Sequence, residues 1–198
     1  MKGSLNKLFS KIISIILVLL PGISLSADVK TIEIQKEKNL YHIHINATVD
    51  ADLDNVIRII TDYENLPLIN PYLKESKLLD NPEDERSTVN MLTEICVLYL
   101  CYNIRHIQIF HTMENGILFS RIIPGKSDFQ AGWMRWEIKE MDSNKIHPVT
   151  RIILDIEMVP DFFVPPVIGP YQIKKIMLGM ARATIINLEK KAKTNPPG

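Results

Sequence analysis

Apolar and polar residues alternate with a period of two over much of the chain, and this pattern predicts β-strands. The clearest case is residues 39–49, NLYHIHINATV, in which every second residue from Tyr41 to Val49 is apolar or small. His42 and His44 belong to the opposite, polar face. The stretch therefore predicts a strand with one buried face.

Six later runs show strand-like patterns, at residues 73–79, 88–96, 101–113, 117–123, 129–141 and 148–159. Asn115-Gly116, which separates the third run from the fourth, is typical of a tight hairpin turn. We therefore expect about seven strands, most of them joined as antiparallel neighbours.

Two regions have helical spacing instead. Asp50 can cap a helix whose apolar positions run from Leu53 to Ile60, and breaks at Asn65-Leu66-Pro67 and Asn70-Pro71 leave room for one more short helix. From about Pro170 to Lys193, apolar residues line one face of a long helix. They are Ile173, Ile176, Met177, Met180, Ala181, Thr184 and Leu188.

Strands and helices that are segregated along the chain predict the α+β class. We expect a strongly bent antiparallel sheet wrapped around the long C-terminal helix, with a short helix pair after the first strand and a cavity between sheet and helix. Gly179 lies inside that helix, where glycine costs about 1 kcal/mol relative to alanine. Close approach of a ligand or of the sheet would explain it, as would tolerance at an exposed position.

The N-terminus predicts export. Residues 1–27 contain three lysines, an apolar run of about nine residues, a Pro-Gly break and a small-residue cleavage region. A membrane-spanning helix needs roughly 20 apolar residues, so a cleaved signal peptide fits better than a retained anchor. We expect a single domain over residues 28–193, a disordered tail over 194–198, and a bacterial periplasmic location.

Cleavage would leave 20 basic and 23 acidic side chains, a formal net charge of −3. This balance argues against nucleic-acid binding, which needs a basic surface. Cys96 and Cys101 flank VLYL at the end of a predicted hairpin, where they form either a disulfide or two buried thiols. Their spacing does not suit a zinc site.

Three stretches carry a family resemblance: TVDADLDNVIRIITDYENLPLINPYLKESKLL (48–79), SDFQAGWMRWEI (127–138) and FFVPPVIGPYQIKKIML (162–178). They resemble the START-like, helix-grip superfamily, in particular its polyketide cyclase/dehydrase and coenzyme-Q-binding branch. The resemblance implies a cavity for a hydrophobic ligand, with lipids, isoprenoids, quinones or polyketides as cargo. It implies no fixed catalytic residues.

The cavity or its mouth is expected to involve aromatic and aliphatic residues of the late strands, the proline-rich connector and the helix. They are Trp133, Trp136, Phe162, Phe163, Val167, Ile168, Ile173, Met177 and Met180. Prolines 165 and 166 would stiffen the connector, and Phe162 and Phe163 would touch ligand or membrane at the mouth.

Chemistry-bearing residues are sparse. His42 and His44 have the spacing of a metal pair but lie on a polar strand face, so solvated histidines fit better and no metal is expected. Arg121, Asp128, Arg135, Glu137, Arg151, Asp155 and Glu157 are best explained by cross-strand ion pairs on the outer face, although a cyclase would need one or two such groups inside.

The sequence thus predicts a protein that binds or carries a hydrophobic small molecule, without a cofactor. The alternative is a cyclase or dehydratase acting on such a molecule in the same cavity. A transient contact with a membrane, through the apolar connector, is a further expectation.

Overall fold

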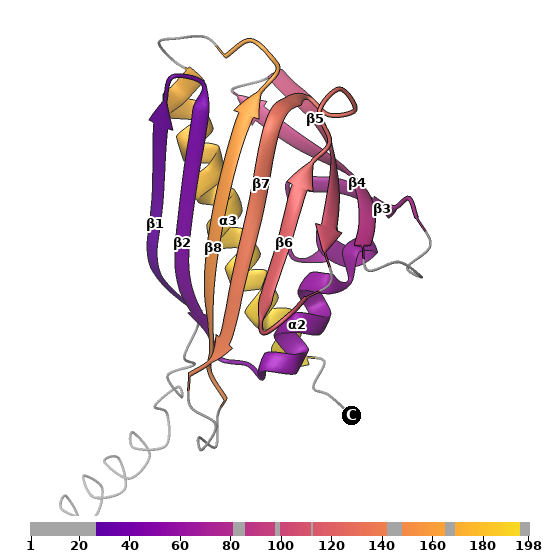
Figure 1. The fold of residues 1–198 in the computed structure, drawn as a ribbon. Helices are drawn as coiled ribbons and strands as arrows, with labels where there is room; N and C mark the ends of the chain where they lie inside the picture. Colours follow the sequence, from indigo (N-terminus) through magenta and orange to yellow (C-terminus); the bar gives the residue numbers. More distant parts are fainter. Residues whose placement is uncertain are drawn as a thin grey trace, which may run out of the picture.

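The computed structural model describes residues 27–80, 86–97, 100–111, 113–141, 148–164 and 169–194. Its elements are β1 (Asp28–Glu37), β2 (Leu40–Val49), α2 (Leu53–Thr61), the 3-10 helix η1 (Tyr63–Leu68), β3 (Leu73–Leu78), β4 (Arg86–Val97), β5 (Leu100–His111), β6 (Ile117–Ile122), β7 (Phe129–Glu140), β8 (Thr150–Pro160) and α3 (Gly169–Thr194) (Figure 1).

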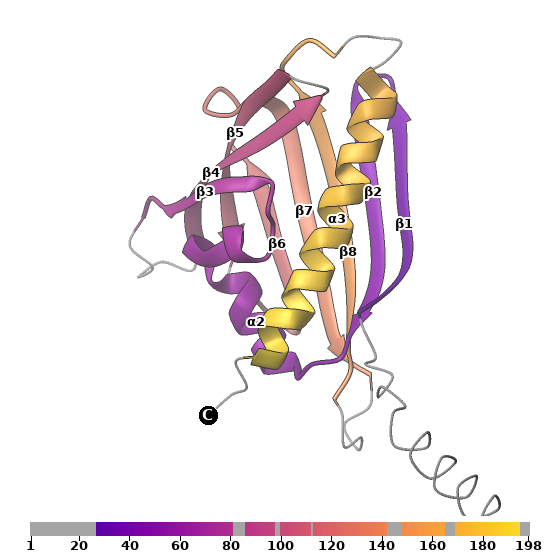
Figure 2. The ribbon, with the colours of Figure 1, turned by 180° about the vertical axis from the view of Figure 1, so that it is seen from behind.

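The strands form one sheet in the order β1-β2-β8-β7-β6-β5-β4-β3, and all neighbouring strands are antiparallel. The sheet curves around α3, which crosses its concave side (Figure 2). This arrangement confirms the predicted α+β helix-grip fold, with eight strands in place of about seven.

The unexpected strand is β1, DVKTIEIQKE, at one edge of the sheet. A bulge between Val29 and Thr31 shifts its register against β2, so Val29 is out of phase with Ile32 and Ile34. The shift interrupts the period-two pattern, and most of the strand is exposed and charged. The sequence signal for this strand is therefore weak.

The cap of α2 is Asp52 and not Asp50. The Asp52 carboxylate accepts hydrogen bonds from the backbone N–H of Asp54 at 2.9 Å and of Asn55 at 3.3 Å. Asp50 instead links the end of β2 to the last turns of α3. Its backbone N–H donates to Glu189 at 2.8 Å, and its carboxylate lies 3.0 Å from Lys193 Nζ.

The turn between β5 and β6 has the expected chemistry. Asn115 and Gly116 have φ values of 50° and 74°, in the left-handed region that this turn requires. A Cβ atom on Gly116 would lie 2.3 Å from the carbonyl oxygen of Ile138, so the hairpin also passes too close to β7 for a side chain.

Cys96 and Cys101 face each other in register on β4 and β5 and are joined by a disulfide. Gly179 allows α3 to pass close to Tyr72, whose hydroxyl oxygen would lie 2.8 Å from a Cβ at this position.

Residues 1–26 of the predicted signal peptide, the connector residues 165–168 and the tail residues 195–198 lie outside the described residues. Among the described helices, none has the length and apolar character needed to cross a membrane.

Candidate ligand-binding site

Burial of the concave face changes along the strands. On β8, Ile152 and Leu154 are 0% and 5% exposed, whereas Ile156 and Met158, which point to the same side, are only partly buried. On β7, Ile138 and Trp136 are buried and Met134 is only partly buried. The concave face of β7 and β8 is therefore less tightly covered at one end than at the other, although Tyr41 and Ile43, opposite Met158 and Ile156 on β2, stay buried.

The helix repeats this gradient. Leu188 and Ile185 are 0% and 1% exposed, whereas Met177, Met180 and Ile173, nearer the N-terminal end of α3, keep accessible surface. We use the term open end for the less buried region of the concave face. Its partly buried side chains are His106, Met134, Ile156 and Met158 on the sheet and Ile173, Met177 and Met180 on α3, and the buried Thr93 and Phe129 border them.

A second apolar cluster, separate from the main core, lies at the open end. Its buried members are Ile104, Ile122 and Phe129, from three different strands. Phe162, which follows β8, packs edge-on against Phe129 with ring centroids 6.0 Å apart. The cluster provides an apolar wall at the end where the sheet and helix do not close.

A chain of four polar side chains runs across the concave face between the two apolar clusters, and we call it the polar chain. Ser120 Oγ on β6 donates to Gln108 Oε1 on β5 at 2.8 Å. Gln108 Nε2 lies 2.9 Å from His106 Nδ1, and His106 Nε2 lies 3.1 Å from Thr93 Oγ1 on β4. Hydrogen bonds thus join three neighbouring strands through side chains alone.

His106 is neutral at physiological pH. Burial lowers its pKa from 6.5 to about 4, and the nearby Asp128 carboxylate opposes that shift without cancelling it. Its ring also meets Phe129 edge-on, with centroids 6.1 Å apart. The residue as a whole is only partly buried, and its neutral imidazole lies at the open end of the concave face.

The structure separates the residues that the sequence assigned to the site. Met177, Met180 and Ile173 lie at the open end, whereas Trp136 is 8% exposed and belongs to the main core. Phe162 and Phe163 lie beyond β8 and are 38% and 83% exposed. Val167 and Ile168 lie outside the described residues.

Trp133 does not line the concave face, which corrects the expectation for this residue. It alternates with Gly132 and Met134 and so points to the outer face, where its Nε1 donates to Glu157 Oε2 at 2.8 Å. Its position two residues before Arg135 indicates the same face.

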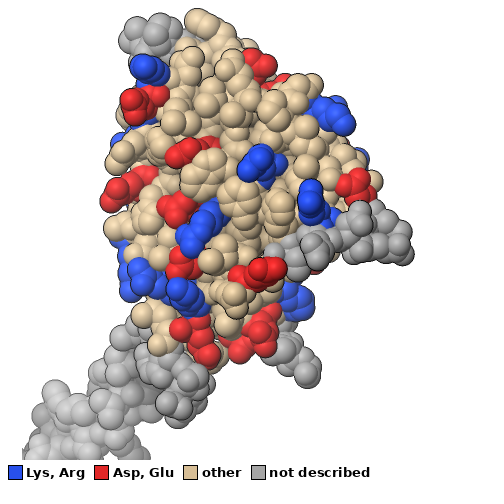
Figure 3. Space-filling model, viewed as in Figure 1, with Lys and Arg blue, Asp and Glu red and all other residues tan. Residues whose placement is uncertain are grey.

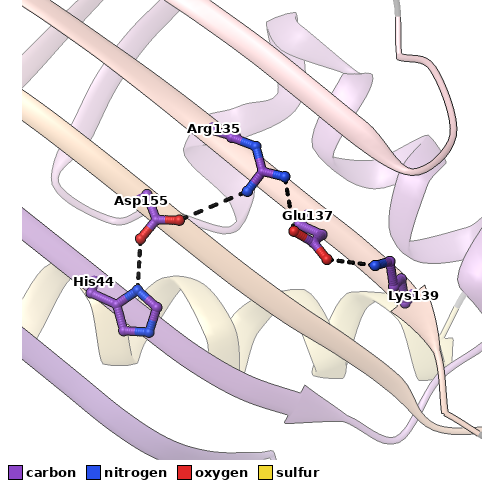
Figure 4. A network of polar contacts seen from close by, with 5 residues as sticks. All are labelled: His44, Arg135, Glu137, Lys139 and Asp155. Carbon is purple, nitrogen blue, oxygen red and sulfur yellow. Dashed lines mark hydrogen bonds and ion pairs between the residues drawn. The ribbon is translucent and has the colours of Figure 1, made fainter.

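Charged groups on the outer face pair with one another, some across neighbouring strands and some along β7. His44 Nδ1 lies 2.6 Å from Asp155, whose other oxygen is 4.0 Å from Arg135 (Figure 4). Arg135 also contacts Glu137 at 2.9 Å, and Glu137 contacts Lys139 at 2.6 Å. Acidic and basic side chains are interspersed over this face (Figure 3).

Of the residues expected to form cross-strand ion pairs, Arg135, Asp155 and Glu157 do so. Glu137 instead pairs along its own strand, Arg151 donates to Asn46, and Asp128 accepts from the backbone of Arg105.

The outer face also has an open hollow of about 380 Å³, bordered by His42, His44, Trp133, Asp155 and Glu157. Both oxygens of Glu157 are already occupied, one by Trp133 and the other by His42 Nδ1 at 3.0 Å. The histidines, carboxylates and Trp133 on the border of this hollow thus pair with one another.

The polar chain was not predicted from the sequence. On β5, polar His106 and Gln108 alternate with apolar Ile107 and Ile109, so the inward face of this part of the strand looks like an outward one. The available signal was that His106 and Gln108 lie at alternate positions between Ile104 and Phe110, and alternate residues of a strand share one face. Two polar side chains therefore lie on an otherwise apolar face.

Comparison with known proteins agrees with this architecture. A family model described as polyketide cyclase / dehydrase and lipid transport matches residues 49–171. No curated protein matches the chain.

Solved structures share the fold at low sequence identity. The Zhui aromatase/cyclase from Streptomyces sp. R1128 superposes with a TM-score of 0.64 and 12% identity, over 78% of this chain and 94% of that one. A protein from Thermus thermophilus gives 0.62 and 15%, over 77% and 97%. A START superfamily protein from Mycobacterium smegmatis gives 0.58 and 17%, over 77% and 97%.

The family model covers more than half of the sequence, and its match includes η1, the polar chain and the start of α3. The resemblance of residues 48–79, 127–138 and 162–178 to the START-like superfamily and its polyketide cyclase/dehydrase branch is thereby confirmed. The chain belongs to the polyketide cyclase/dehydrase and lipid transport family of START-like proteins.

Proposed function

We propose that the protein binds and carries a hydrophobic small molecule between the sheet and α3, at the open end. The observation that carries the proposal is the loss of burial along β8, from Ile152 to Met158, on a face that is otherwise the core of the fold. Apolar surface left accessible there gains roughly 25 cal/mol per Å² when a ligand covers it.

Family membership supports the same class of ligand, without naming the molecule. The test is organic extraction of protein purified under native conditions from its own source, followed by mass spectrometry. We expect an apolar compound in a near-stoichiometric amount. Repeatedly empty preparations that also fail to bind added apolar probes would contradict carriage.

A cyclase or dehydratase is the second candidate, and His106 is the observation that favours it. A neutral imidazole beside a ligand can accept a proton. Incubation of the extracted ligand with purified protein separates the two functions, because a carrier returns the ligand unchanged and a dehydratase returns it with loss of water. Catalysis also requires that His106→Gln abolish that conversion while binding persists.

We also propose that the ligand is exchanged at a membrane. Phe163 and Tyr171 are 83% and 68% exposed at the end of the molecule where α3 begins, and Lys174 and Lys175 are exposed in the next turn. Aromatic side chains with adjacent lysines suit the interface of a bilayer that contains anionic lipids.

Export to an oxidising compartment is part of the same proposal. It is supported by the signal-like residues 1–27 and by the suitability of the Cys96–Cys101 disulfide to such a compartment. Intact-mass measurement of protein from its native source should give a chain that starts at Asp28. A chain that retains the N-terminal segment would contradict cleavage.

A further inference from the structure

The polar chain and the described strand positions around it carry no formal charge, and this bears on which ligands can lie against it. The inward-facing positions described on β4, β5 and β6 include Thr93, His106, Gln108 and Ser120, but no lysine, arginine, aspartate or glutamate. His106 itself is neutral near pH 7. A carboxylate placed against this surface would therefore lose water without gaining an opposite charge, and an ammonium group would find only the exposed Asp128 carboxylate near His106.

The polar chain also has one accessible end. Ser120 is 1% exposed and lies between the main core and Gln108, so it forms the closed end. His106 keeps more accessible surface than Thr93 and Gln108, which are both buried. A ligand that enters the open end therefore meets the His106–Thr93 hydrogen bond first.

Protons in the polar chain can be ordered in two ways. In one order Gln108 donates to His106 Nδ1, and His106 Nε2–H donates to Thr93, which leaves the Thr93 hydroxyl proton for a ligand. If the Gln108 amide rotates by half a turn and His106 carries its proton on Nδ1, Thr93 donates to Nε2 and its oxygen can accept. Every hydrogen bond within the chain persists in both orders, because each member is both donor and acceptor.

We propose that the ligand presents an uncharged oxygen to the Thr93–His106 end of the polar chain, and that the site accepts either a carbonyl or the corresponding hydroxyl. A carbonyl takes the proton of Thr93 in the first order, and a hydroxyl donates to the Thr93 oxygen in the second. This inference rests on the proposed carriage of an apolar molecule and specifies its polar group.

The test uses displacement of diphenylhexatriene, an uncharged fluorescent probe, from the purified full chain. Four competitors have apolar chains of similar length: methyl nonyl ketone, the corresponding secondary alcohol, decanoate and decylamine. We expect the ketone and the alcohol to compete with Kd values within about threefold of each other, and each charged compound at least about tenfold more weakly.

Equal or tighter competition by decanoate or decylamine overturns the restriction to uncharged groups. If the Kd values of the ketone and the alcohol differ by more than about tenfold, the proposal that the polar chain switches between its two proton orders is overturned. If diphenylhexatriene and all four competitors fail to bind, the proposed carriage itself fails, which is a different result.

Two variants test whether His106 and Thr93 contact the oxygen of the ligand. His106→Phe keeps a ring that can pack against Phe129 and removes both nitrogens, so ketone and alcohol should bind about tenfold more weakly while undecane binds as before. Thr93→Val removes the terminal hydroxyl at similar volume and should act in the same direction. His111→Phe, on the outer face of β5, is the matched control and should change nothing. Unchanged ketone binding in folded His106→Phe or Thr93→Val overturns the assignment.

Discussion

His106 Nε2 lies 3.1 Å from Thr93 Oγ1 on the neighbouring strand, on the concave side of the sheet. This contact holds a neutral imidazole at the open end of the concave face. The hydrogen bond links the side chains of β4 and β5 at the position along the strands that separates the main core from the second apolar cluster.

The first prediction concerns pH. Because the pKa of His106 is about 4 in the folded protein and 6.5 for an ordinary histidine, the unfolded chain binds this proton more readily between those values. The free energy of unfolding should therefore fall as pH decreases from 6.5 to 4, by up to about 3 kcal/mol from this group.

NMR titration of the imidazole measures the pKa directly, and urea unfolding at several pH values measures the stability. His106→Phe should lose this part of the pH dependence, whereas His111→Phe should retain it. An imidazole of His106 that titrates near 6.5 would contradict the buried neutral state.

The second prediction concerns the hairpin glycine. Gly116→Ala places a Cβ 2.3 Å from the Ile138 carbonyl oxygen and also strains a left-handed residue, so it should destabilise the protein by more than about 2 kcal/mol. Gly125 has a similar φ of 75° but open space around its Cβ position. Gly125→Ala should cost only about 1 kcal/mol. Equal losses in urea unfolding would mean that the contact with β7 is not tight.

The third prediction concerns the disulfide. The bond between Cys96 and Cys101 closes a short loop, so its reduction should lower the free energy of unfolding by about 2 kcal/mol. Urea unfolding with and without reductant measures the loss. The double variant Cys96→Ser, Cys101→Ser should show no effect of reductant, and thiols titratable in the unfolded, unreduced protein would rule the bond out.

The fourth prediction concerns the membrane. Phe162→Ser with Phe163→Ser should lower flotation of the protein with vesicles that contain anionic lipid, because aromatic surface at the open end is removed. Leu79→Ser removes a similarly exposed apolar side chain away from that end and serves as the control. Flotation that is unaffected by the double change, or lowered equally by the control, would argue against this contact.

Period-two alternation was sufficient to predict most of the fold. It assigned residues 39–49 and the strands on either side of Asn115-Gly116, and helical spacing assigned the long terminal helix, because each has one continuous apolar face. The alternation failed for β1, where the bulge after Val29 changes the phase. The pattern also could not identify Asp52 as the cap of α2, because Asp50 and Asp52 both precede the apolar run.

The candidate site was less predictable. Trp133 and Trp136 are both aromatic, but their opposite parity places one among outer-face ion pairs and the other in the core. The polar chain depends on register between strands, since Thr93 reaches His106 only when β4 and β5 pair in their observed alignment. The pattern on one strand shows which residues share a face, but the partner of each residue depends on how the β4–β5 hairpin is aligned.

The central claim is that a ligand occupies the space beside Met158, between sheet and helix. The most direct test is diphenylhexatriene binding to Met158→Trp, which fills that space, compared with Ile153→Trp, which points to the outer face of the same strand. We expect binding to weaken at least about tenfold in Met158→Trp and to stay unchanged in Ile153→Trp, with both proteins folded. Undiminished binding by folded Met158→Trp would contradict the account.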